Sequence, residues 1–219
     1  MLCDNHQRRG RECERSPFAY AARAAPFGTR RLAVRYRLRE VIIARRMSGV
    51  DENGGVKIME IRKLKENDLD KVMEIYKVSR EFMVANGNPN QWGDNYLNRE
   101  SIKSHINNDG YVVVSDGEVV GVFVLQDYEP VYDSIDGSWL NDELYGVIHR
   151  LASGGTHKGV GQFILDWCLN KTGNIRIDTH EDNVPMLKLL KKNGYTYCGK
   201  VSFGEHGERM AFQKIKVAD

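Results

Sequence analysis

The chain has 219 residues, a suitable length for one domain of ordinary size, and its 32 basic and 30 acidic side chains leave a formal net charge of only +2. No apolar run approaches the roughly 20 residues that a membrane span needs, and no secretory signal is visible. The four cysteines show neither metal-ligand spacing nor a disulfide framework. These features predict a cytoplasmic protein with no metal site and no membrane anchor.

The first 58 residues differ in composition from the rest. They hold twelve Arg and one Lys against six acidic residues, a balance of +7, whereas residues 59–219 have a balance of −5. We interpret residues 1–58 as a basic extension that is disordered or that is upstream sequence translated from a misplaced start codon. A mitochondrial presequence is a second option, although Glu12 and Glu14 argue against it, and an arginine-rich nucleic-acid arm ranks last. The domain is therefore expected at residues 59–219, with nucleic acid an unlikely partner.

The first half of that domain reads as short strands and helices. Asn67-Asp68 is predicted to cap a helix whose apolar residues recur at helical spacing. Asp116-Gly117 is typical of a two-residue hairpin turn between two β-rich runs. The predicted elements are a strand at 60–63, a helix from residue 69, a short helix at 99–106, and strands at 111–115 and 118–126.

A glycine-rich stretch at residues 153–161 follows a predicted strand at 145–152 and leads into an amphipathic helix. Its glycines allow close approach of a ligand to the backbone, and the first N–H groups of the helix have no partner within it. Phosphate oxygens bind such groups, and Lys158 adds a positive charge. A nucleotide P-loop is excluded because Lys158 comes before the glycine and no hydroxyl residue follows the lysine. A dinucleotide-binding fingerprint is excluded because Ile164 stands where that motif needs a small residue.

The last part of the chain predicts a strand, a helix and two more strands. Asp182 or Asn183 is a suitable N-cap, and Asn193-Gly194 supplies a left-handed helix stop. The strands are predicted at 175–180, 196–203 and 209–215. Together with the hairpin and the strand before the glycine loop, this order predicts an α/β (α+β) fold with one mixed central β-sheet flanked by helices.

Two segments resemble the signatures of the GCN5-related N-acetyltransferase (GNAT) superfamily. The segment from Thr156 to Gly161 resembles the superfamily's pyrophosphate loop, Arg/Gln-x-x-Gly-x-Gly/Ala, and matches it at both glycines but not at the first position. The segment 183–195 resembles the second signature, Asn-x-x-Ala-x-x-Leu-Tyr-x-x-x-Gly-Phe, with Leu190 in place of its tyrosine. The resemblance covers roughly residues 59–216.

The resemblance implies a single GNAT-like domain that transfers an acetyl group from acetyl-coenzyme A to a primary amine, with a small molecule as the expected acceptor. Acetyl-coenzyme A is then a cosubstrate, and the main chain of strand 145–152 and its loop would hold pantetheine and the thioester carbonyl. Homodimer formation is left open. The implied cofactor-binding residues are Leu151, Ala152, Ser153, Thr156, His157, Lys158, Gly159, Val160, Gly161 and Asn183.

The transfer requires a base that deprotonates the amine, and protonation assists the leaving thiolate. His149 is the first candidate base, acting directly or through water, and a buried structural histidine is the alternative. His180, Asp178 and Glu129 are further candidates for the base. Tyr195 is a candidate acid because Leu190 replaces the usual tyrosine, although the matching family position normally packs in the core. The replacement also leaves a rival hypothesis, a coenzyme A-binding module that has lost catalysis.

Overall fold

The computed structural model describes residues 49–50, 56–93 and 97–217. The predicted basic extension, residues 1–58, lies outside the described residues except for 49–50 and 56–58. Two short strands, β1 (Gly49–Val50) and β2 (Val56–Lys57), pair antiparallel with each other in a sheet of their own.

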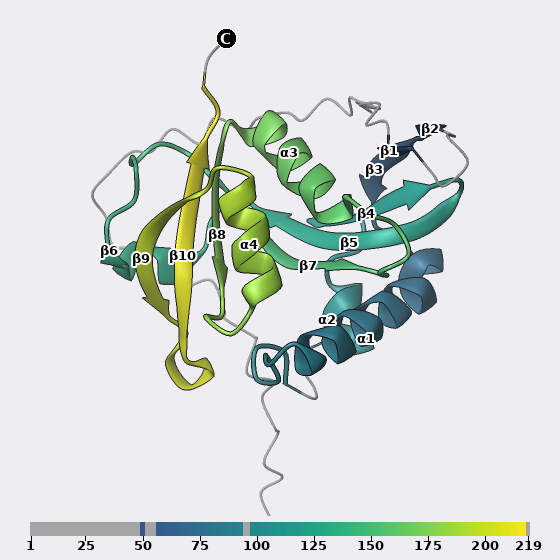
Figure 1. The fold of residues 1–219 in the computed structure, drawn as a ribbon, viewed down its shortest axis with the longest axis horizontal. Coiled ribbons are helices and arrows are strands. Elements are labelled where there is room, and N and C mark those ends of the chain that lie inside the picture. Colours follow the sequence, from purple (N-terminus) through teal and green to yellow (C-terminus); the bar gives the residue numbers. More distant parts are fainter. Residues whose placement is uncertain (1–48, 51–55, 94–96, 218–219) are drawn as a thin grey trace, which may run out of the picture. The chain divides into compact units, whose positions relative to one another are not determined.

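An eight-stranded mixed sheet organises the rest of the chain (Figure 1). Its strand order is β3-β4-β5-β7-β8-β10-β9-β6, and all pairs are antiparallel except β7 with β8. The strands are β3 (Met59–Lys63), β4 (Gly110–Ser115), β5 (Glu118–Gln126), β6 (Asp136–Gly137), β7 (Gly146–Ser153), β8 (Asn174–Thr179), β9 (Thr196–Ser202) and β10 (Glu208–Ile215).

Helices cover both faces of this sheet, as the alternation of buried side chains shows. Tyr111 and Val113 of β4 pack in one cluster with α3 (Val160–Thr172), whereas Val112 and Val114 pack in another with α1 (Leu69–Ala85) and α2 (Arg99–Lys103). Helix α4 (Val184–Lys192) adds Leu190 to the cluster of α3. Because neighbouring strand residues point to opposite faces, α1 and α2 lie on one face and α3 and α4 on the other. The prediction of one mixed sheet flanked by helices is confirmed.

The 3-10 turn η2 (Pro130–Ser134) and the segment that follows it to residue 145 cover the remaining part of the sheet on the α1 face. Tyr132 is 1% exposed there and packs with Val147, Val201 and Ala211 from three strands. The sequence predicts no element at residues 127–144, because this stretch has neither helical nor alternating apolar periodicity.

Several local predictions agree with the structure and two differ. Asp116 and Gly117 both have positive φ, +52° and +83°, as a hairpin turn of type I′ requires, and Asn183 is the N-cap of α4, its side chain accepting the N–H of Met186. Asp68 does not cap α1 with its side chain, which instead accepts the N–H of Lys65 and pairs with Arg62. Helix α2 ends at Lys103, so the prediction of a helix to residue 106 was too long.

Candidate functional site

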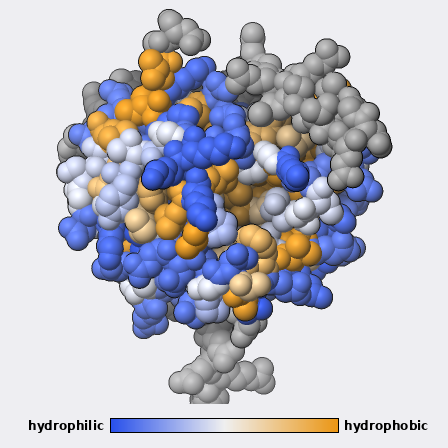
Figure 2. All heavy atoms as spheres, viewed as in Figure 1, coloured by the Kyte–Doolittle hydropathy of each residue, from blue (hydrophilic) through white to orange (hydrophobic). Residues whose placement is uncertain are grey.

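Strands β7 and β8 separate soon after they begin. Their parallel pairing consists of two residue pairs, Gly146 with Ile175 and Val147 with Arg176. From Ile148 to Ser153, β7 pairs only with β5 among the described strands. The two strands therefore open into a fork, and Figure 2 shows a recess with hydrophobic walls near the centre of the view that displays α3 and α4. In a fork of this kind, N–H and C=O groups of β7 that would otherwise pair with a neighbouring strand can bind a ligand.

A β-bulge interrupts β7 inside this fork. Val122 and Val124 of β5 pair with Ala152 and His149, so two residues of β7, Arg150 and Leu151, lie opposite one residue of β5. Arg150 has φ +53°, a left-handed conformation that costs a non-glycine residue about 1–2 kcal/mol. Bulges and positive φ values are both common next to active sites, where they redirect a side chain or a main-chain group.

The glycine-rich loop after β7, which the sequence predicts as an anion site, leads directly into α3. Gly155 and Gly159 have positive φ, +78° and +83°, and a Cβ on either would meet no atom within 4 Å. The first helical hydrogen bond of α3 runs from the N–H of Phe163 to the carbonyl of Gly159, so the N–H groups of residues 160–162 have no acceptor within the helix. Lys158 is exposed beside them. Such N–H groups at a helix start are a general arrangement for binding anions.

Gly161 has a different role from Gly159. A Cβ on Gly161 would lie 2.9 Å from Cδ2 of Leu189, so this glycine lets α4 pack against the first turn of α3. The predicted residue Val160 is 1% exposed, and Leu151 packs in the same core cluster, so their main chains rather than their side chains face the fork. Nδ1 of His157 and Oγ1 of Thr156 lie 2.9 Å apart and form a hydrogen bond.

Three of the predicted base candidates gather on the opposite side of the fork. His149 lies with Nε2 3.2 Å from Oε2 of Glu129, and the side chains of these two residues are 20% and 17% exposed. Asp178 accepts a 2.6 Å hydrogen bond from the hydroxyl of Tyr132. His149, Asp178 and the segment that carries Glu129 and Tyr132 thus meet on the α1 face of the sheet.

The two carboxylates beside His149 differ in their tendency to ionise. Burial opposes ionisation of Glu129, but the contact with His149 and the hydrogen bond from the N–H of Val131 together outweigh it and hold the pKa of this carboxyl below its usual value. Burial dominates at Asp178 and raises the pKa of its carboxyl, against the attraction of His149 and the hydrogen bond from Tyr132. Glu129 is therefore the stronger counter-ion for a protonated His149.

His180 and Asn183 lie at the end of β8 and are engaged in local contacts. Nδ1 of His180 accepts the N–H of Asp182 at 3.3 Å and lies 3.2 Å from its carboxylate. The amide of Asn183 donates to Oε1 of Gln91 at 2.9 Å, in addition to capping α4. Gln91 thereby links the segment after α1 to the start of α4, which the sequence analysis did not anticipate.

Tyr195 lies inside the core. Its side chain is 7% exposed, packs in the cluster of α3 and α4, and has a buried hydroxyl with no hydrogen-bond partner in the described part of the chain. Burial raises the pKa of Tyr195 above its usual value. Leu190, which stands at the position of the family tyrosine, is fully buried as well. This placement favours the packing interpretation of Tyr195 over the role of a thiolate acid.

A cavity of about 470 Å³ runs along α1 beside the bulge. Its walls include Tyr76, Arg80 and Trp92, and the rings of Tyr76 and Trp92 meet edge to face at 5.7 Å. The hydroxyl of Tyr76 donates to the carbonyl of Arg150 at 3.2 Å, so the cavity wall contacts the bulge directly. Among the described residues, no group of three or more His, Cys, Asp or Glu side chains is arranged to hold a metal ion, and no helix is long and apolar enough to cross a membrane.

Comparisons with solved structures agree with this architecture. An acetyltransferase of the GNAT family from Streptococcus agalactiae is 34% identical, with a TM-score of 0.67 over 73% of this chain and 96% of that one. The fold is shared with an acetyltransferase from Staphylococcus aureus, at 24% identity and a TM-score of 0.53 over 71% of this chain and 97% of that one. It is also shared with yncA from Salmonella typhimurium, determined with its cofactor acetyl-CoA, at 14% identity and a TM-score of 0.50 over 74% and 95%. No family model and no curated protein matches the sequence significantly.

The mixed sheet with its β7–β8 fork is the fold of an acetyltransferase. On its similarity to the streptococcal protein, the chain belongs to the GNAT family. The predicted family and fold class are confirmed, whereas the individual site residues stay predictions.

Proposed function

We propose that this protein transfers an acetyl group from acetyl-coenzyme A to a primary amine of a small molecule. The observation that carries the proposal is the position of the His149–Glu129 pair at the fork between β7 and β8, on the strand that leads through the glycine loop into α3. The coenzyme supplies an activated acetyl thioester when it is bound. A cytoplasmic location also stays a prediction, and homodimer formation stays open.

The loop and the first turn of α3 would bind the diphosphate of the coenzyme. The N–H groups of residues 160–162 point outward from the start of the helix, and Lys158 adds charge attraction. The main chain of Leu151 to Ser153, in the part of β7 that β8 does not pair with, would hold pantetheine and polarise the carbonyl by hydrogen bonding.

His149 would accept the proton that the amine loses, directly or through one water. The imidazolium that forms is stabilised by the adjacent Glu129, whose lowered pKa keeps it ionised. Nε2 of His149 is buried 3.2 Å from Oε2 of Glu129 without the geometry of a hydrogen bond, so charge attraction would couple the two side chains once the imidazole takes up a proton. Asp178, which accepts the hydroxyl of Tyr132, lies near enough to interact with the charge of His149.

A second function is favoured by one specific observation. Leu190 has no hydroxyl and the hydroxyl of Tyr195 is buried, so neither residue offers an acid to a leaving thiolate at the site. A domain that binds the coenzyme without turning it over, as a sensor or an interaction module, would need no such acid.

Thioester cleavage with a panel of polyamines, amino acids, aminoglycosides and peptides separates the two functions. The proposal expects thiol release that depends on the amine and gives an acetylated product. Tight coenzyme A binding without turnover on any amine would instead support the binding module.

A further inference from the structure

The bulge of β7 decides which residues of this strand face the acceptor side of the fork. Residues three apart in a regular strand point to opposite faces. His149 and Ala152 nevertheless pair with Val124 and Val122, which are two apart on β5 and share a face. Arg150 is the additional residue that makes this possible. The direction of His149 toward Glu129 is thus coupled to the conformation of Arg150.

Helix α1 holds the main chain of the bulge by two side chains. The hydroxyl of Tyr76 donates to the carbonyl of Arg150 at 3.2 Å, and the hydroxyl of Ser79 donates to the carbonyl of Ser153 at 2.9 Å. Both carbonyls belong to the part of β7 that β8 leaves unpaired. These contacts fix the two ends of the segment proposed to hold pantetheine.

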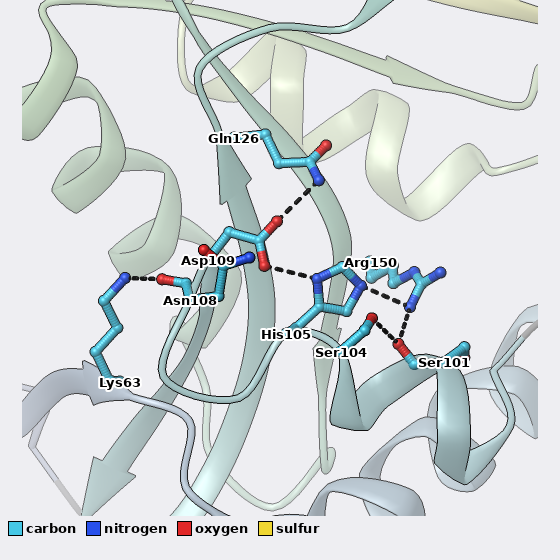
Figure 3. Close-up of polar contacts among 8 residues, drawn as sticks. All are labelled: Lys63, Ser101, Ser104, His105, Asn108, Asp109, Gln126 and Arg150. Carbon is cyan, nitrogen blue, oxygen red and sulfur yellow. Dashed lines mark hydrogen bonds and ion pairs between the residues drawn. The ribbon is translucent and has the colours of Figure 1, made fainter. Parts of the chain in front are cut away.

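The guanidinium of Arg150 is held by residues of a different part of the chain (Figure 3). Its Nη1 donates to the carbonyl of Ser101 at 3.3 Å and lies 3.0 Å from Nε2 of His105. Nδ1 of His105 lies 2.7 Å from Oδ1 of Asp109, and the other oxygen of Asp109 accepts the side-chain amide of Gln126 at 2.8 Å. The chain of contacts thus runs from β7 through the segment after α2 to β5.

These contacts define one arrangement of protons. Because a guanidinium can only donate, Nε2 of His105 is the acceptor and Nδ1 is the donor to Asp109. Burial opposes ionisation of Asp109, but the hydrogen bonds from His105 and Gln126 hold the pKa of this carboxyl below its usual value. An ionised Asp109 therefore orients the imidazole toward Arg150. His105 and Asp109 are well shielded from solvent, at 14% and 16% side-chain exposure.

We infer that Arg150 is a positioning residue for the acetyl transfer, held by His105 and Asp109, and that it sets the direction of His149 and of the main chain after it. The inference rests on the proposed function for its kinetic readout. A glycine would adopt the same φ more easily, so the contribution of arginine lies in its side-chain contacts.

Arg150→Gly in the full chain tests the inference, because glycine tolerates the bulge conformation while all side-chain contacts are lost. We expect kcat to fall by about 10- to 100-fold, as displaced reacting groups produce. His105→Gln, which keeps an acceptor for Arg150, should retain more activity than His105→Leu. Arg99→Ala is the matched control, because this arginine of α2 pairs with Asp70 on the surface and should leave kcat unchanged. Unchanged kcat in Arg150→Gly would overturn the inference.

A second readout does not depend on turnover. NOE contacts between the His149 ring and the Glu129 side chain, which meet at 3.2 Å, should be lost in Arg150→Gly and kept in Arg99→Ala. If no amine is acetylated by the wild-type protein, the proposed function fails, and these contacts still decide the positioning role. Retained contacts in Arg150→Gly would overturn it.

Discussion

His149 and Glu129 should behave as one catalytic unit rather than as two independent groups. Their side chains meet at 3.2 Å, and both are largely shielded from water. Removing a general base typically costs about 10²-fold or more in rate, which corresponds to roughly 2.7 kcal/mol of transition-state stabilisation. We therefore expect His149→Gln and Glu129→Gln each to lower kcat/KM by about 10²-fold.

The double variant makes this prediction specific. Two independent groups would multiply to a loss of about 10⁴-fold, whereas members of one unit lose little more together than singly. We expect the double variant to remain near about 10²-fold, with coenzyme A binding retained. His149→Gln should also remove the acidic limb of the pH–rate profile, because a protonated imidazole cannot accept the proton of the amine.

Steady-state kinetics with an accepted amine and calorimetry with coenzyme A are the assays. Glu208→Gln serves as the control, because Glu208 forms an ion pair with Lys200 at 2.9 Å but is 64% exposed. Multiplicative losses, or single variants with wild-type kcat/KM, would refute the reasoning. A lower Tm with an unchanged pH profile would identify His149 as a structural residue.

Three further predictions concern binding and stability. Gly159→Val should weaken coenzyme A binding in calorimetry and also lower Tm, because a β-branched residue is strained at φ +83°, whereas Gly161→Val should lower Tm because its side chain would meet Leu189 of α4; an unchanged Kd in Gly159→Val or an unchanged Tm in Gly161→Val would contradict these expectations. Asp68→Asn should lower the free energy of unfolding by about 1–3 kcal/mol at pH 7, because it weakens the bidentate ion pair with Arg62, whose two hydrogen bonds measure 2.7 and 2.8 Å. The hydrogen bond from Arg62 lowers the folded-state pKa of Asp68. The difference in free energy of unfolding between wild type and variant, measured with denaturant, should therefore be complete above about pH 4 and vanish as the pH falls through that pKa. A difference that stays constant with pH would contradict this expectation. A chain that begins at Met59 should keep the Tm and coenzyme A affinity of the full chain, and marked destabilisation would contradict the interpretation of residues 1–58 as an extension.

The elements that sequence predicted well are those with local signals. The hairpin at Asp116-Gly117, the amphipathic α3 and the N-cap Asn183 each depend on residues within one or two turns of chain. The glycine loop was predicted for the same reason, because glycine residues by themselves indicate a main chain that can adopt left-handed conformations. These local features sufficed to identify the fold.

The contacts that complete the candidate site are not local. Arg150 carries no sequence signal for a positive φ, and its partner His105 is 45 residues away. Tyr132 reaches Asp178 across 46 residues from a segment without periodicity. The spacing of His105 and Asp109 by four residues was the one available signal of that cluster. Gly161 was expected to approach phosphate, yet its neighbour in the structure is Leu189, which only the packing of α4 on α3 reveals.

The most direct test of the account measures coenzyme A thiol and acetylated amine in the same reaction. Acetyl-coenzyme A with a labelled acetyl group, the full chain and each amine of the panel would be incubated together, and both products quantified by mass spectrometry. The account predicts equal amounts of thiol and labelled acetyl-amine for at least one small amine, both strongly reduced in His149→Gln. Thiol release without labelled amine, or bound coenzyme with neither product, would contradict it.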